Sequence, residues 1–241
     1  MPTFPTGWKQ NQNQQQGVDF VSVVSAFPWL NRTAIARTAG AAAAAVYAFG
    51  FTPAVGSLLV VIGMGPVTWT TPTGWTLAQV QLNTGGLYVF TKIAVAGDVS
   101  FTTDHNGTGG ADFPTSFQVY EFKATSTFQT GSSAHLTTAS AVTLPGYASG
   151  LIGTNNLAFW NVLYSIGNNK PASTIAITAA GSTSILNSTQ LNATSGAGDG
   201  TDTATNYIAG QSASIPAATV TETGSPSQAG ETITFVISVA P

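Results

Sequence analysis

The chain consists largely of short β-type segments separated by frequent turns. This pattern limits the folds that the chain can adopt. Residues 57–62 (SLLVVI) form an apolar, β-branched run bounded by glycines, which is typical of a buried strand. Residues 86–94 alternate, so that Leu87 and Val89 share one predicted face. Turns rich in Gly, Asn and Pro separate these runs from the other predicted strands, which cover residues 74–80, 99–102, 116–123, 157–164, 174–178, 207–209, 218–221 and 232–239.

This spacing predicts an all-β fold, an antiparallel β-sandwich, rather than alternating strands and helices. We expect the sandwich body to occupy residues 55–241, preceded by an N-terminal arm and linker over residues 1–54. Residues 1–17 are too polar to pack a core and are predicted to be an extended arm. Residues 33–46 are rich in alanine, and they predict one short helix or an extended linker.

Charged residues are unusually scarce, at 6% of the chain, compared with about 25% in ordinary soluble domains. A free monomer relies on surface charge to resist association. A surface of Thr, Ser, Asn, Gln and Gly instead favours a protein that is embedded among neighbours. The net charge of −3 and the few basic residues in the arm exclude a basic patch of the kind that binds DNA or RNA.

The sequence also argues against two further classes of protein, those that depend on cysteine chemistry and those that span a membrane. The chain has no cysteine, so disulfides, thiol catalysis and thiolate metal sites are absent. Residues 39–64 are mostly apolar and long enough for a membrane span. Pro53 and several glycines interrupt this run and no basic residues flank it, so we expect no membrane segment.

The predicted arm carries aromatic residues that suit contact with another subunit. Phe4 and Trp8 stand in an otherwise polar sequence, where aromatics are typical anchors for a partner's groove. Basic residues accompany them in a region with a slightly positive balance. The predicted assembly contacts are Phe4, Trp8, Lys9, Arg32 and Arg37.

The order of motifs after residue 55 resembles a β-sandwich module of phage particle proteins. An apolar strand at 57–62 precedes the element 72–77 (PTGWTL), and 85–102 (GGLYVFTKIAVAGDVSFT) follows it. The element 72–77 is the most specific part, and the resemblance covers roughly residues 55–241. It implies a jelly-roll-like sandwich from tail, fibre or head-surface proteins, with no catalytic residues. Residues 1–54 have no counterpart in it, and 182–215 are longer and more polar than the module requires.

Tryptophans are predicted to belong to the core. Pro72 and Gly74 favour a tight turn that directs Trp75 onto the sandwich, and Trp160 lies in an apolar strand. The predicted core residues are Trp75, Leu87, Val89 and Trp160. The alternative function for exposed aromatics is stacking on a sugar, for which Trp75, Trp160, Tyr164, Tyr147 and Tyr207 are the candidates.

Catalytic patterns are missing. The two histidines, His105 and His135, lie in loop-like sequence, and no nucleophile elbow is present. Asp104, Asn106 and Asp112 could offer oxygen ligands to Ca²⁺, but they do not follow the EF-hand spacing, so a polar hairpin loop is the preferred interpretation. We therefore expect no enzyme activity, no cofactor and no metal.

Together these features predict a structural phage virion protein, located at the capsid surface as a decoration or head-fibre subunit. Its expected partners are copies of itself and other virion proteins, held by weak contacts that symmetry multiplies. The alternatives are a tail or tail-fibre subunit, and a carbohydrate-binding adhesin that attaches to a host surface glycan.

Overall fold

A computed structural model describes most of the chain from residue 28 onward, and every regular element in it is a β-strand. The described residues are 28–37, 44–65, 68–83, 85–104, 115–136, 141–144, 146–147, 151–152, 155–166, 174–191, 200–211, 214–223 and 230–241.

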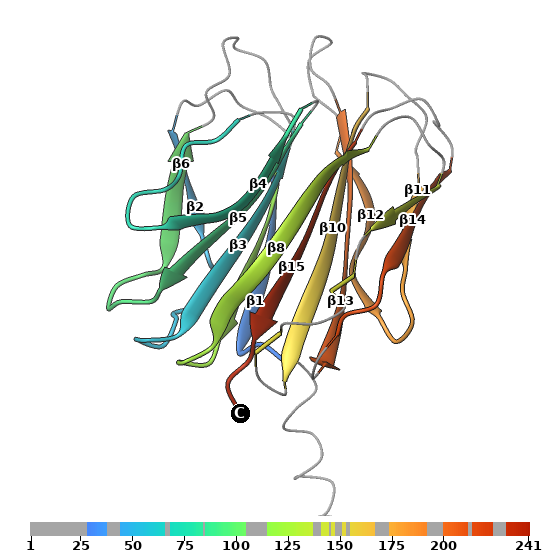
Figure 1. Ribbon diagram of the computed structural model, residues 1–241. Coiled ribbons are helices and arrows are strands. Elements are labelled where there is room, and N and C mark those ends of the chain that lie inside the picture. Colours follow the sequence, from blue (N-terminus) through green and yellow to red (C-terminus); the bar gives the residue numbers. More distant parts are fainter. Residues whose placement is uncertain are drawn as a thin grey trace, which may run out of the picture.

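Two five-stranded antiparallel sheets form the body (Figure 1). The first main sheet has the order β1 (Asn31–Arg37), β7 (Thr115–Phe122), β3 (Leu58–Gly65), β5 (Gly86–Ile93) and β4 (Thr76–Leu82). The second main sheet has the order β8 (Thr127–Leu136), β15 (Gly230–Ser238), β10 (Asn156–Ile166), β13 (Gly200–Gln211) and β12 (Thr183–Leu191). The antiparallel sandwich predicted from the sequence is confirmed.

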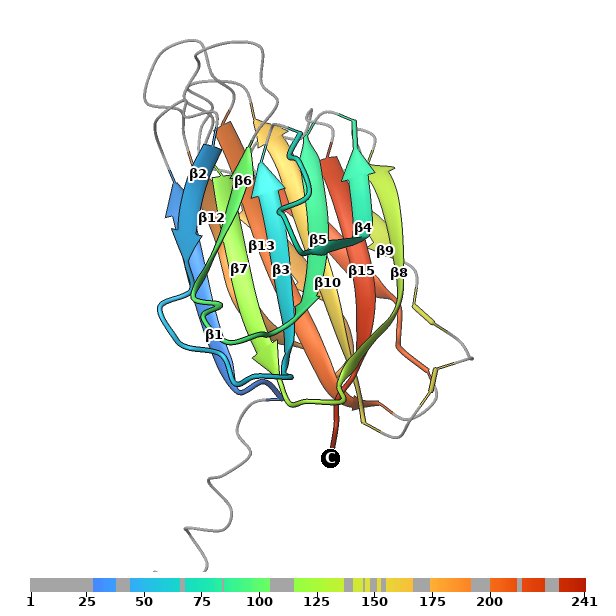
Figure 2. The ribbon, with the colours of Figure 1, turned by 90° about the vertical axis from the view of Figure 1, so that its left-hand side faces the viewer.

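A smaller sheet covers the outer face of each main sheet. The first outer sheet pairs β2 (Ala44–Ala48) with β6 (Ser100–Asp104), and Figure 2 shows it in front of β7 and β3. The second outer sheet has the order β11 (Thr174–Thr178), β14 (Ala218–Thr223) and β9 (Ala141–Leu144). The result is a stack of four β-layers with three hydrophobic cores between them.

This stack explains why the main strands are apolar on both faces. All eight residues of β3 are buried, because alternate side chains enter the central core and the first outer core. Leu87 and Val89 lie in the central core, as predicted. Trp75 lies in the first outer core and Trp160 in the second, so both tryptophans are buried as expected.

The two halves of the chain repeat the same topology. Each main sheet comes from one half, and the order β1-β7-β3-β5-β4 matches β8-β15-β10-β13-β12. The outer pair β2–β6 likewise matches β9–β14, and β11 is an addition in the second half. Within each half the chain passes back and forth between the main sheet and its outer sheet, as β1, β2 and β3 do at the start of the first half and β5, β6 and β7 at its end, which is the crossing expected of a jelly-roll-like sandwich.

Local details recur between the halves as well. In the turn before β4, the Trp75 amide donates to the Pro72 carbonyl at 3.0 Å, and Gly74 has a φ of +80°. Before β12, the Ser182 amide donates to the Ala179 carbonyl at 3.1 Å, and Gly181 has a φ of +75°. A bulge follows each turn, between Leu77 and Gln79 in β4 and between Ser184 and Leu186 in β12.

Two boundaries differ from the sequence predictions. Residues 31–37 pair with β7 and residues 44–48 pair with β6, so the sandwich includes part of the region assigned to the linker. The short helix considered for residues 33–46 is wrong for the described part, where both ends are strands: β-sheet pairing and burial of Tyr47 outweigh the helix propensity of alanine. The predicted arm, residues 1–17, lies outside the described residues.

No helix in the described ranges is long and apolar enough to span a membrane. The apolar run at 39–64 contributes β2 and β3 instead.

A row of buried polar side chains crosses the central core. The Tyr120 hydroxyl donates to Gln118 Oε1 at 2.6 Å, and Gln118 Nε2 donates to Thr205 Oγ1 at 2.7 Å. Thr205 in turn donates to Asn161 Oδ1 at 3.0 Å. Because these bonds join β7 to β13 and β10, they fix how the two main sheets face each other. Burial raises the pKa of the Tyr120 hydroxyl, which therefore stays a donor.

The close contact of the first main sheet with its outer cover can be tested at Gly63. A Cβ at this position would lie 2.6 Å from the Trp69 ring and 2.9 Å from the Phe117 ring. We expect Gly63→Ala to lower the free energy of unfolding by about 1–3 kcal/mol through overpacking, measured by chemical denaturation. Thr76→Ala, at an exposed site of β4, is the control and should change it by less than about 0.5 kcal/mol. If the two substitutions changed the free energy of unfolding equally, the close packing around Gly63 would be contradicted.

Candidate functional site

A surface hollow of about 430 Å³ lies beside the first outer sheet and is the best candidate binding site. Such a volume falls in the range of small-ligand pockets, about 300–1,000 Å³. Its walls come from three segments: the turn before β4, the end of β5 and the start of β6. The lining residues are Thr70, Thr71, Pro72, Thr73, Trp75, Lys92, Ser100, Phe101 and Thr102.

The turn before β4 builds one wall because its sequence suits a tight reversal. Gly74 adopts a positive φ, which a side chain would strain, at the position where a type II turn requires it. Directly after the turn, the Trp75 indole packs edge-on against Phe49 and Phe101 with ring centroids 6.3 and 6.0 Å apart. Trp75 therefore anchors this wall to the first outer core.

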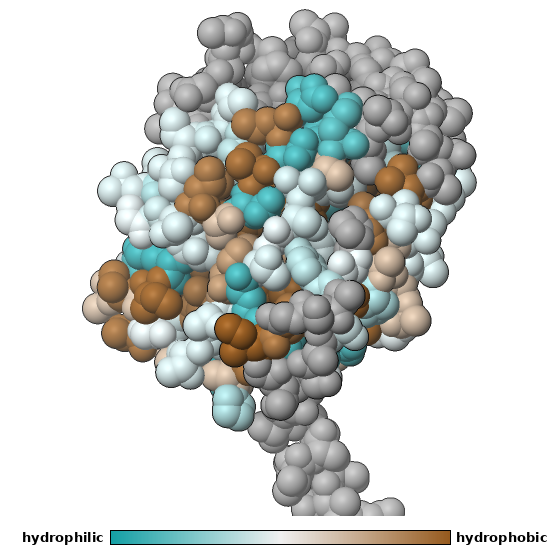
Figure 3. Space-filling model, viewed as in Figure 1, coloured by the Kyte–Doolittle hydropathy of each residue, from teal (hydrophilic) through white to brown (hydrophobic). Residues whose placement is uncertain are grey.

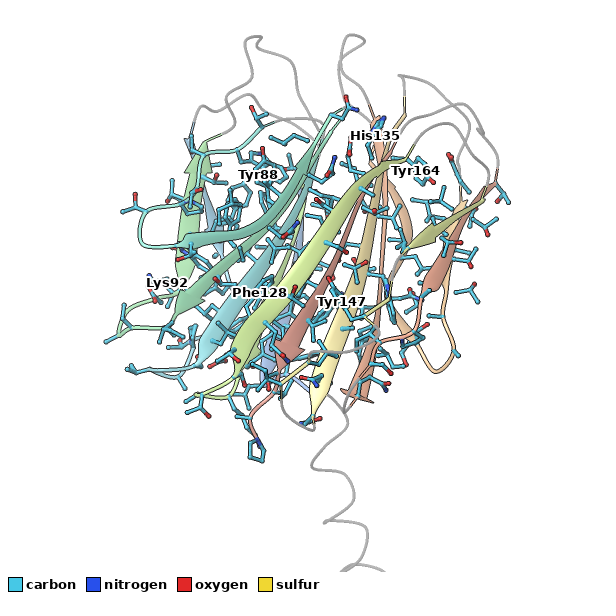
Figure 4. The ribbon with its side chains drawn as sticks, in the orientation of Figure 1. Tyr88, Lys92, Phe128, His135, Tyr147 and Tyr164 are labelled. Atoms are coloured by element: carbon cyan, nitrogen blue, oxygen red, sulfur yellow. The ribbon has the colours of Figure 1, made fainter. Side chains whose placement is uncertain are left out.

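An ion pair at the end of β5 supplies the charge of the hollow. Lys92 Nζ lies 2.6 Å from Asp98 Oδ1 and 6.0 Å from the centroid of the Trp75 ring. Asp98 also accepts a bond from the Val95 amide at 2.8 Å. Partial burial opposes ionisation of Asp98, but the bonds from Lys92 and Val95 outweigh it and hold the pKa of this carboxyl below its usual value. In Figure 4 Lys92 lies at the left of the body, near the end of β5.

The hollow combines hydroxyl groups, one ammonium and aromatic rings, with no carboxylate among its lining residues. Such a set can bind a neutral polar ligand through hydrogen bonds and ring contacts. It offers no nucleophile–base pair and no group of metal ligands. Among the residues that the structure describes, no three metal-ligating side chains gather anywhere.

The second half carries different side chains at the turn that corresponds to the one beside the hollow. Ser182 stands where the first half has Trp75, at the end of the same turn. A Cβ on Gly74 would lie 3.8 Å from Lys92 Nζ, and a Cβ on Gly181 would lie 3.4 Å from Ile208 Cδ1, so Ile208 takes the place of Lys92. Ile208 belongs to the second outer core. In the described part of the second half an apolar side chain therefore stands where Lys92 borders the hollow.

The predicted assembly contacts are only partly visible. Arg32 is half-buried: its Nη2 lies 3.5 Å from Gln118 Oε1 and 3.4 Å from the Ile185 carbonyl, and its guanidinium lies over the Tyr120 ring. It therefore contacts both main sheets within its own chain. Arg37 ends β1, and its side chain is outside the described part of the structure. Phe4, Trp8 and Lys9 also lie outside the described residues.

A tryptophan that the sequence patterns did not identify as a core residue, Trp29, lies just before β1. The Trp29 ring packs against Tyr120, Tyr207 and Phe159, with centroids 5.3, 5.0 and 6.4 Å apart. It enters the central core from the segment that leads into the sandwich. Its position beside Pro28, ahead of an alternating segment, was a signal that could have identified it.

Buried carboxylates serve as structural acceptors. Glu121 accepts bonds from Asn31 Nδ2 at 2.6 Å and from the Ala54 amide at 2.7 Å, which ties β1 and the β2–β3 connection to β7. Glu231 is buried, and one of its oxygens lies 3.2 Å from His135 Nδ1. On the opposite side of the second main sheet, burial and the nearby Glu222 raise the pKa of Tyr164 to about 12. Figure 4 places His135 and Tyr164 at the upper end of the sandwich.

Of the calcium candidates, Asn106 and Asp112 are outside the described residues, and Asp104 is the last residue of β6 with its side chain undescribed. The other sugar-stacking candidates form no exposed aromatic face. Trp160 and Tyr164 are buried in the second outer core, Tyr147 donates to the Thr234 carbonyl at 3.1 Å, and Tyr207 packs against the central core.

The described surface carries very little charge. Lys123 is the one charged side chain that is exposed among those described. The others are paired, half-buried or buried, namely Arg32, Lys92, Asp98, Glu121, Glu222 and Glu231. Figure 3 shows apolar side chains gathered at the lower left, where the β5–β6 connection lies, and Ile93, Val95 and Val99 are exposed in that region.

No protein-family model matches the chain, and the comparisons with curated proteins and with solved structures find no match.

The bonds to Asp98 can be tested by titration. Because the pKa of Asp98 is lowered in the folded protein, its bonds stabilise the fold above the unfolded value of about 3.9, and this stabilisation disappears as the pH falls through the folded pKa. We expect Lys92→Met to raise the midpoint of Asp98, measured by NMR of the carboxyl carbon. An unchanged midpoint would show that Lys92 does not hold this carboxylate.

Proposed function

We propose that this chain is a non-enzymatic structural subunit of a virus particle, acting through protein–protein contacts within a symmetric assembly at the particle surface. The observation that carries the proposal is the nearly uncharged surface. Among the described side chains Lys123 alone is both charged and exposed, so this part of the surface has little of the charge that keeps a free monomer apart from its neighbours.

Exposed apolar side chains strengthen this argument. Val46, Val55, Ile93, Val95 and Ile152 are each more than half exposed. Several of them lie near the connections of the first half, where Figure 3 shows an apolar group. Exposed apolar side chains that lie together are typical of surfaces that other proteins cover. The assignment to a phage virion rests on the resemblance around residues 72–77.

The start of the sandwich suits a subunit that is linked through its N-terminal region. Trp29 is held by three aromatic rings of the central core, so the chain that precedes it departs from a fixed point. Tension or docking applied through residues 1–27 would be carried directly to both main sheets, because Tyr120 belongs to the first and Phe159 and Tyr207 to the second.

A second candidate function is glycan binding in the hollow beside β6. Its threonine hydroxyls, Lys92 and the Trp75 ring are the kind of groups that hold a neutral sugar. An adhesin of this type would bind glycans as a monomer, and Lys92→Ala would weaken that binding without unfolding the protein.

The two candidate functions predict different masses for the purified chain in solution. We expect the full chain to form a trimer or larger ring in light scattering and sedimentation, and deletion of residues 1–17 to weaken it. Since few charges are exposed in the described part of the chain, the association should change little between low and high salt. A monomer at all concentrations, unaffected by the deletion, would contradict the structural role and favour the glycan-binding alternative.

A further inference from the structure

Exposed apolar side chains are concentrated at one end of the sandwich, the end where β3 begins and where β5 and β7 finish. Nine large apolar side chains in the described ranges are exposed, and three of them lie within β2 and β4. The other six lie in or beside the connections at this end, and we call the surface that they form the apolar end. It consists of Leu30, Val55, Ile93, Val95, Val99 and Ile152.

Backbone hydrogen bonds bring the connections of the first half together at the apolar end. The Gly56 amide donates to the Ala94 carbonyl at 2.8 Å, which places Val55 beside the β5–β6 connection. The Phe49 amide donates to the Val99 carbonyl, also at 2.8 Å. Figure 2 shows these connections at the lower end of the body, where Figure 3 shows the apolar group.

The apolar end extends over both main sheets. The Leu30 amide donates to the Glu121 carbonyl at 2.7 Å, close to the end of β7 in the first main sheet. The Ile152 amide donates to Gln129 Oε1 at 2.6 Å, close to the start of β8 in the second main sheet. Isolated exposed apolar side chains are ordinary, but several at one place are typical of a surface that another protein covers.

The β5–β6 connection holds its valines in a fixed conformation. Asp98 accepts bonds from Lys92 Nζ at 2.6 Å and from the Val95 amide at 2.8 Å, and its own amide donates to the Val95 carbonyl at 3.2 Å. The loop is therefore ordered by polar contacts, while Val95 and Val99 remain exposed. A surface that is already ordered loses little conformational entropy when a partner covers it.

The second half shows that the fold does not require apolar residues at this connection. Ile208 takes the place of Lys92, and residues 209–212 (AGQS) follow it where the first half continues with Ile93 and Val95. Ile215, further along the same connection, is buried. In its described part the β13–β14 connection thus exposes no large apolar side chain, so the apolar residues of the first half call for another explanation.

We propose that the apolar end is the surface through which copies of this chain meet, gathered around the symmetry axis of the assembly. This inference rests on the proposed role as an assembly subunit and identifies which part of the surface makes the contact. In a ring, residues close to the axis lie near the same residues of the neighbouring copies. Contact at the axis would therefore remove the apolar side chains of every copy from water together.

Charge and apolar character both favour a second copy as the partner. Lys92 and Asp98 neutralise each other, and Lys123 on the β7–β8 connection is the one exposed charge that the described residues place at this end. A long lysine side chain can keep its ammonium group in water at the rim of a contact. Within the described surface, the apolar end itself is the matching apolar surface that another copy can offer.

The N-terminal segment enters the sandwich at the same place. Leu30 belongs to the apolar end, and residues 1–27 precede it with Lys9 and Asp19 as their only charges. The predicted assembly contacts Phe4 and Trp8 are therefore connected to the chain at the end where we expect the copies to meet.

Two lysine substitutions at valines of equal exposure provide the test. Val55 at the apolar end and Val46 on β2 are both 69% exposed, so Val55→Lys and Val46→Lys add the same charge at matched sites. The mass of each full-length chain is measured by sedimentation equilibrium over a range of concentrations. We expect Val55→Lys to weaken association by about tenfold or more, because it brings like charges together at the axis, and Val46→Lys to change it by less than about twofold. High salt should restore part of the association of Val55→Lys.

Cross-linking tests the position of the axis independently. The chain contains no cysteine, so Val95→Cys and Val46→Cys each carry a single thiol. Residues near an axis meet their own copies, so mild oxidation should link Val95→Cys chains into disulfide dimers. We expect their yield to exceed that of Val46→Cys by about tenfold or more, because association raises the local thiol concentration.

The outcomes separate this contact from the assembly role. If the unmodified chain associates but Val55→Lys and Val46→Lys behave alike, the contact at the apolar end is overturned and the assembly role stands. If Val55→Lys loses stability without a change of mass, a segment of the same chain covers this end, which also overturns the contact. An unmodified chain that stays monomeric at all concentrations would overturn both.

Discussion

The fold depends on central strands that are apolar on both faces and therefore need cover on both sides. In β3, Leu58, Val60 and Ile62 enter the central core, while Leu59 and Val61 enter the first outer core. Strand β10 is arranged in the same way, with Phe159 inside and Trp160 outside. A two-layer sandwich would leave one of these faces in water, at a cost of roughly 1.5–3 kcal/mol for each large side chain. The small outer sheets exist to remove that cost.

Much of this could be predicted from local patterns. The turn at 72–75, the alternation of Leu87 and Val89 and the apolar runs at 57–62 and 157–164 identified strands and core residues, because each signal lies within one element. The outer sheets could not be predicted in this way. Alanine-rich residues 44–48 pair with β6 from more than fifty positions away, and long-range pairing and burial of Tyr47 outweigh the local preference. The hollow was missed for the same reason, since its walls come from three separate segments.

The repeated topology of the two halves was also hidden in the sequence. The turns at Gly74 and Gly181 share their geometry, yet Trp75 and Lys92 correspond to Ser182 and Ile208. Side chains have diverged while strand order, turn and bulge are retained. In the second half, β11 lies beside β14, and Ile208 packs into the second outer core. At the corresponding place in the described part of the first half, β6 borders the hollow.

Amide hydrogen exchange of β6 and β14 tests this difference between the halves most directly. Among the described strands β14 pairs on both sides, with β9 and β11, whereas β6 pairs with β2, so we expect the amides of β14 to exchange more slowly than those of β6. If the amides of β6 exchanged as slowly as those of β14, the two outer sheets would not differ in this way and the account would be contradicted.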